Sequence, residues 1–219
     1  MRIRRWLWSA GLVAVLGLGA GCAHDETKQA RIRGEKVGKA LAEKVRFADQ
    51  LSLLNQEQIV LAHVALEKST HPEVRRFAED LIRDHQRNQD ELERLAESKA
   101  MSLTRVDLTM GDQAIGGAGL EGMQRGLESG DDAYNKKYDE QVTEFLETRN
   151  ALRVLSGDEF DEAFLAEVKK GQERGEELVD KGLDDYRDDT TFAVFLTRTA
   201  PVFASHQQRS ETLEGYLGD

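Results

Sequence analysis

The chain of 219 residues contains 30 basic and 41 acidic side chains, for a formal charge of −11. A single cysteine excludes an intramolecular disulfide framework and Cys-rich metal sites, and a pI near 5.0 argues against a nucleic-acid binder, which needs a basic stripe. Only two prolines, with 32% charged residues, favour a mostly helical protein.

The N-terminal segment has the pattern of an export signal. Arg2, Arg4 and Arg5 precede an uncharged run from Trp6 to Ala20. At about 1.5 Å per residue, a helix of this length is shorter than the hydrocarbon core of a bilayer, which is about 30 Å thick. A basic start, a short apolar stretch and small residues at its end predict a signal peptide over residues 1–21.

The end of this run resembles a bacterial lipobox, Leu18-Gly19-Ala20-Gly21-Cys22. The motif departs from the usual pattern, because Gly19 stands where leucine is preferred. We expect Cys22 to be lipidated and to become the mature N-terminus; the alternative is ordinary cleavage near Ala20 to Ala23. Cleavage before Cys22 leaves 27 basic against 41 acidic side chains, a net charge of −14.

Two helices are predicted after a charged tether at residues 22–48, which itself becomes helical and can continue into the first of them. The first helix has an apolar stripe with spacings of three and four, and ends before His71-Pro72. Its stripe is Leu51, Leu54, Gln58, Leu61 and Ala65. The second starts at Pro72 and fades by Ser98. Its stripe is Val74, Phe77, Ala78, Leu81, Ile82, His85, Asn88, Leu92 and Leu95.

A glycine-rich insertion at residues 104–130 separates this pair from the rest. An extra helix is predicted over Asp132–Leu155, and two more helices follow Ser156-Gly157 and Asp184-Asp185, with Pro201 kinking or restarting the last. No strand pattern is present. Two helix pairs joined by a long crossover predict an all-α, ferritin-like four-helix bundle with one extra helix, in a domain spanning residues 49–219.

Several motifs in chain order resemble one exported bacterial family. The first half carries Asn55-Gln56-Glu57-Gln58, then Ala65 to Val74, Phe77-Ala78, Asp84-His85 and Asn88. The second half carries Phe160-Asp161, Ala163-Phe164-Leu165, and Pro201 followed by His206. Over about residues 51–217 this resembles the domain of unknown function 4142 family, often labelled predicted outer-membrane protein. The resemblance implies a ferritin-like fold and an envelope location, and brings no settled biochemical role.

Each bundle helix places one large polar residue on its apolar stripe. These are Gln58, His85, Gln172 and His206, and together we name them the polar layer. Members of the resembling family often carry Glu at the Gln58 position and His at the Gln172 position, and amides cannot replace charged bridging ligands. Ferritin-type metal sites use Glu-x-x-His pairs, but the residues three positions before His85 and His206 are Ile82 and Phe203. We therefore expect a hydrogen-bond layer that fixes helix register, with no catalytic residue and no cofactor.

Alternatives remain open at this point. His85 and His206 could hold Zn²⁺, Cu²⁺ or Ni²⁺, which would make the protein a metal-binding oxidase or storage protein. A pocket beside the polar layer, opened by Gly171 and Gly175, could serve a small-molecule sensor. The main expectation is a non-enzymatic binding, structural or stress-related module. We expect its lipid to hold it at the outer membrane, facing the periplasm; the alternative is a soluble periplasmic protein. An envelope protein is a possible partner, and no nucleic acid is expected to bind.

Overall fold

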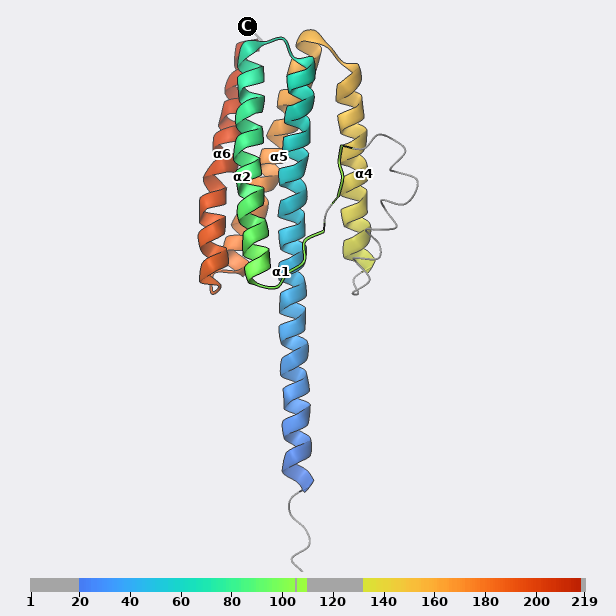
Figure 1. Cartoon of the computed structure of the whole chain (residues 1–219), viewed down its shortest axis with the longest axis vertical. Helices are drawn as coiled ribbons and strands as arrows, with labels where there is room; N and C mark the ends of the chain where they lie inside the picture. Colours follow the sequence, from blue (N-terminus) through green and yellow to red (C-terminus); the bar gives the residue numbers. More distant parts are fainter. Residues whose placement is uncertain (1–19, 105, 110–131, 218–219) are drawn as a thin grey trace, which may run out of the picture. The chain divides into compact units, whose positions relative to one another are not determined.

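A computed structural model describes residues 20–104, 106–109 and 132–217 of the chain, and it is all-helical over these residues (Figure 1). The predicted signal peptide at residues 1–21 lies almost wholly outside this range, as does most of the predicted glycine-rich insertion at 104–130. The chain divides into two compact units, residues 1–42 and 43–219. No helix within the described ranges is both long and apolar enough to cross a membrane.

Five helices are described, and their bounds agree closely with the sequence patterns. They are α1 (Ala20–Lys68), α2 (Pro72–Ser98), α4 (Asp132–Val154), α5 (Gly157–Asp185) and α6 (Thr190–Leu217). The tether and the first predicted helix are continuous in α1. Pro201 lies inside α6 without ending it. Gly157 begins α5 with a φ of +60°, a left-handed conformation that glycine adopts without steric cost.

The second unit contains a four-helix bundle of α1, from residue 43 onward, with α2, α5 and α6 (Figure 1). The colours of Figure 1 show α2 and α5 running in the same direction, because α4 returns along the bundle between them. Two antiparallel pairs joined by such a return are the connectivity of ferritin-like bundles. The predicted all-α, ferritin-like fold with one extra helix is confirmed.

The core of this unit consists of two apolar clusters. One contains Leu61, Leu81, Phe164, Val168 and Leu213, together with most of the buried side chains of α4. The other contains Leu54, Leu92, Val179, Phe192 and Phe203. Each of the four bundle helices therefore contributes to both clusters. In each of these helices, the predicted polar residue lies between the residues that belong to one cluster and those that belong to the other.

Candidate functional site: a buried polar layer and an outer cleft

The polar layer lies between the two apolar clusters. Gln58, His85 and Gln172 are fully buried, and His206 is 4% exposed. Along each helix the polar residue falls between an apolar residue of one cluster and an apolar residue of the other, as His85 falls between Leu81 and Leu92 on α2. The structure thus brings the four predicted residues to one level of the bundle.

His85 uses both of its ring nitrogens in this layer. Its Nδ1 lies 2.9 Å from Oδ1 of Asn55, and its Nε2 lies 3.3 Å from Nε2 of Gln172. An amide oxygen can only accept and an amide nitrogen can only donate, so the Nδ1 carries the proton and the Nε2 accepts. His85 is therefore a neutral imidazole held by two amides, one from α1 and one from α5.

Two glutamines complete the hydrogen-bonded part of the layer. Nε2 of Gln172 donates to Oε1 of Gln58 over 2.8 Å, which joins α5 to α1. Gly171 makes this approach possible, because a Cβ there would lie 2.0 Å from Nε2 of Gln58. The Phe203 ring likewise fills the space beside Gly175, where a Cβ would lie 2.2 Å from its nearest atom. These glycines permit close helix packing and do not open the pocket that the sensor hypothesis required.

His206 has different contacts from those expected. Its ring stacks on His85 with centroids 5.5 Å apart, and its Nε2 lies 3.4 Å from Oδ2 of Asp84. Its Nδ1 is buried and has no hydrogen-bond partner in the described part of the chain. The expected hydrogen-bond layer therefore includes Gln58, His85 and Gln172 but not His206, whose ring faces Asp84 and His85 rather than the glutamines. Nε2 of Gln58 and Oε1 of Gln172 are also buried without a partner among the described residues.

Burial keeps both imidazoles neutral. Desolvation lowers the pKa of His85 to about 3, with a further decrease from His206. Burial also lowers the pKa of His206, although the neighbouring Asp84 carboxylate opposes that change. At neutral pH the layer therefore carries no charge on its two histidines.

The donor set does not match a ferritin-type metal centre. Such centres use carboxylates and histidines from the four helices, whereas this layer offers two imidazoles and amides. Both ring nitrogens of His85 form hydrogen bonds. Of the four ring nitrogens of His85 and His206, only Nδ1 of His206 has no partner among the described residues. Across residues 20–104, 106–109 and 132–217, no three His, Cys, Asp or Glu side chains converge on a common point suitable for a metal ion.

Three further residues belong to this level but were not assigned to the polar layer from the sequence, although Asn88 stands on the predicted stripe of α2. Asn55 is fully buried and binds His85, while Asn88 and Thr199 are buried and bind each other over 3.0 Å. The signal that could have found them is spacing, because Asn55 precedes Gln58 by three residues and Asn88 follows His85 by three. Such positions share a helix face.

Glu57 lies off the main stripe of α1 and is nevertheless buried. Its side chain is 2% exposed and accepts a hydrogen bond from the Arg174 guanidinium over 3.0 Å. Burial raises the pKa of Glu57 to about 7, although Arg174 offsets part of this effect. The extra helix α4 explains the burial, because it covers the face of α1 that the main stripe leaves outside. His63, on the same helix, is exposed.

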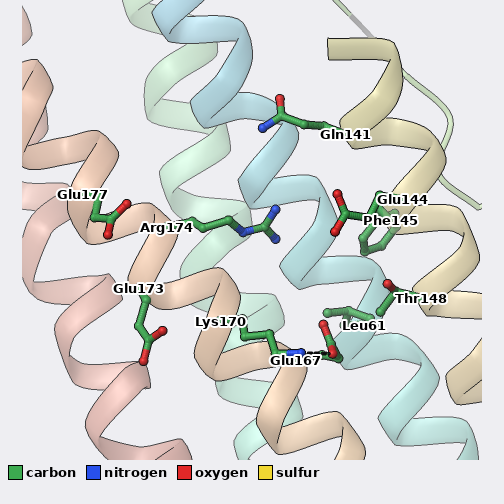
Figure 2. A pocket seen from close by; sticks show the side chains of 10 residues that line it. All are labelled: Leu61, Gln141, Glu144, Phe145, Thr148, Glu167, Lys170, Glu173, Arg174 and Glu177. Carbon is green, nitrogen blue, oxygen red and sulfur yellow. Dashed lines mark hydrogen bonds and ion pairs between the residues drawn. The ribbon is translucent and has the colours of Figure 1, made fainter. Parts of the chain in front are cut away.

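A cleft of about 430 Å³ lies between α1, α4 and α5, next to this ion pair. Figure 2 shows Arg174 extending from α5 toward Glu144 on α4, with Phe145 and Leu61 on the same side. Lys170 pairs with Glu167 over 2.7 Å. The cleft is predominantly acidic, with Glu173 and Glu177 also along its α5 side.

Comparisons with known proteins agree with this architecture. The crystal structure of a DUF305 fragment from Deinococcus radiodurans is similar, with a TM-score of 0.51 and 16% sequence identity over 80% of this chain and 94% of that chain. At this identity the likeness concerns the fold alone. No curated protein matches the chain. The family model described as Domain of unknown function (DUF4142) matches residues 34–213, well over half of the sequence, and the chain therefore belongs to that family.

Proposed function

We propose that this protein is a lipid-anchored helical bundle of the cell envelope that acts as a non-enzymatic binding or structural module. The observation that carries the proposal is that both ring nitrogens of His85 already form hydrogen bonds with amides, so neither is free to bind a metal ion or a substrate. A layer whose hydrogen bonds join α1, α2 and α5 serves helix register. Function would then reside on the outer surfaces and at the membrane anchor.

Metal analysis tests the non-enzymatic part of the proposal. Protein purified without chelators should contain less than one metal ion per chain, and the content should not change in His85→Ala. His63→Ala provides the matched control, because His63 is exposed on α1. Stoichiometric iron, manganese, zinc or copper that is lost in His85→Ala and retained in His63→Ala would favour a metal-dependent oxidase or storage protein instead.

Cell fractionation tests the anchor. Two or more acyl chains on a single cysteine are enough to hold a protein stably in a membrane. Cys22→Ala removes their attachment site and should move the protein from the membrane fraction to the soluble fraction. Ala23→Ser keeps the cysteine and should stay in the outer membrane. Ala23→Asp should shift the protein to the inner membrane if the residue after Cys22 directs sorting. Membrane retention of Cys22→Ala would contradict the anchor.

A further inference from the structure

The part of α1 that belongs to the first unit is an uncovered helix. Every residue over 31–41 is exposed, including large apolar side chains such as Val37, which is 69% exposed. Gly34 and Gly38 lower the helix propensity of this segment, and nothing lies within 4 Å of their Cβ positions. A helix without packing is marginal in water, so a surface that covers one of its faces would stabilise it.

The charge of this segment is opposite in sign to that of the rest of the mature chain. Residues 27–42 contain five basic side chains and one acidic one, whereas residues 43–219 contain 22 basic and 38 acidic side chains. Arg31 and Glu35 pair over 3.9 Å, and both are exposed. The other four basic residues form no ion pair with any residue in the described ranges; they are Lys28, Arg33, Lys36 and Lys39. A basic segment on an acidic protein attracts an anionic partner.

The helical period divides this segment into two faces. One face is small and apolar, with residues at i, i+3, i+4 and i+7, namely Gly34, Val37, Gly38 and Leu41. At about 100° per residue, the three lysines fall on the opposite side and Arg33 lies at the edge between the two. A basic face opposite an apolar one is typical of a helix that lies in the plane of a membrane interface.

We propose that residues 28–41 of α1 lie along the surface of a bilayer that contains anionic phospholipids. The four unpaired basic side chains would contact lipid phosphates, and the apolar face would enter the interface. The inference rests on the proposed anchor for its location, because Lys28 is only six residues, or about 9 Å of helix, beyond Cys22. In a helix perpendicular to the bilayer, Lys39 would be about 25 Å from Cys22, well beyond the Debye length of about 8 Å, so only a flat orientation uses all four charges.

Vesicle binding of residues 22–219 with Cys22→Ala tests the proposal without any acyl chain. At low salt this chain should sediment with vesicles that contain phosphatidylglycerol and not with vesicles of phosphatidylcholine alone. Each basic side chain near an anionic surface contributes about fivefold, so neutralising all four should weaken binding about 100-fold or more. This charge-removal variant combines Lys28→Gln, Arg33→Gln, Lys36→Gln and Lys39→Gln.

A matched control removes the same charge from the second unit. It neutralises four exposed arginines that form no ion pair with any described residue, and it should bind vesicles as the wild type does. The control combines Arg94→Gln, Arg153→Gln, Arg187→Gln and Arg198→Gln. Circular dichroism of both variants checks that they fold.

A single tryptophan reports on the apolar face directly. Trp6 and Trp8 are the only tryptophans of the chain and both precede Cys22, so residues 22–219 contain none. The emission of Val37→Trp should shift to the blue with phosphatidylglycerol vesicles and not with phosphatidylcholine vesicles. Val194→Trp, at an exposed position on α6, should show no shift with either.

Salt separates this inference from the anchor. At about 1 M salt the Debye length is about 3 Å, so protein held by the basic helix alone should leave the membrane, and lipid-anchored protein should stay. Fractionation of cells carrying Cys22→Ala in high salt therefore tests the anchor, and the vesicle assay tests the helix.

Four results would overturn the proposal: phosphatidylglycerol does not increase binding, the charge-removal variant binds as tightly as the wild type, the arginine control loses as much binding, or the Val37→Trp emission does not change. Association of vesicle-free chains that the charge removal abolishes would instead assign the helix to the acidic unit of a second copy.

Discussion

The stacked rings of His85 and His206 meet different neighbours. His85 bridges Asn55 and Gln172 in a fully buried position, whereas His206 reaches a partly exposed Asp84 and leaves its Nδ1 unused. Removing His85 leaves an amide oxygen and an amide N–H without partners in an apolar surrounding, and removing His206 leaves only a carboxylate that Arg83 and Arg87 still contact.

This difference predicts unequal costs for the same substitution. His85→Leu should lower the free energy of unfolding by about 1–3 kcal/mol, the cost of buried groups left unpaired. His206→Leu should stay within about 1 kcal/mol of the wild type, because it removes a buried nitrogen that has no partner and a contact to a partly exposed carboxylate. Urea unfolding of both variants measures the difference. Equal costs would contradict the assignment of hydrogen bonds in the layer.

At the scale of whole elements, Asp189 joins three parts of the second unit. It lies just before α6, where its Oδ1 accepts a hydrogen bond from the Phe192 N–H over 3.2 Å. Lys44 of α1 contacts its Oδ2 over 2.5 Å, and Lys99, just after α2, contacts its Oδ1 over 2.8 Å. Desolvation alone would raise the pKa of Asp189, but the two ammonium groups and the N–H together outweigh it and lower the pKa to about 2.

Asp189→Asn should therefore destabilise the protein at neutral pH. The amide keeps the helix-capping oxygen but loses the charge that attracts both lysines, and we expect a cost of about 1–2 kcal/mol. Asp188→Asn is the matched control, because Asp188 is an exposed neighbour in the same turn. Thermal unfolding at low salt measures the effect. A loss that is the same in both variants would show that the three-way contact contributes nothing.

Packing between α5 and α6 depends on Gly175. A Cβ at this position would meet three atoms of the Phe203 ring at 2.2 to 2.7 Å, and this ring is fully buried and cannot swing aside. Gly175→Ala should cost about 1–3 kcal/mol through overpacking. Gly215→Ala is the control, since nothing lies within 4 Å of its Cβ position and alanine is the better helix former. Chemical unfolding of the two variants should give effects of opposite sign.

For the molecule as a whole, periodicity predicted the helices and the fold because each bundle helix has one continuous apolar stripe. It could not predict the second buried face of α1, where Leu53, Glu57, Val60 and Val64 are covered. That face is buried only because α4 returns along it, and the return is a property of the tertiary arrangement. The polar layer residues could be named from their stripe positions, but their pairing depends on side-chain directions that spacing does not determine.

Proton linkage changes stability in opposite directions for His85 on α2 and for two buried carboxyl groups on α1. His85 has a folded pKa of about 3 against an ordinary value of 6.5, so its contribution to stability is full above 6.5 and is lost as the pH falls. Glu57 and Asp49 have folded pKa values of about 7 and about 6, raised from 4.5 and 3.8 by burial. Their contributions are full at low pH and are lost as the pH rises through those folded values.

Between about pH 4.5 and pH 6 the single imidazole contribution offsets only part of the loss from the two carboxyl groups, which predicts a melting temperature that falls gently as the pH rises. Glu57→Gln removes one of the two carboxyl contributions while keeping an oxygen for Arg174. Its melting temperature should therefore rise relative to that of the wild type as the pH increases from about 4.5 to about 7. Glu177→Gln, at an exposed position on α5, should show no such trend. A constant difference between Glu57→Gln and wild type across this range would mean that Glu57 is ionised in the folded protein throughout, and that the Arg174 ion pair outweighs its burial.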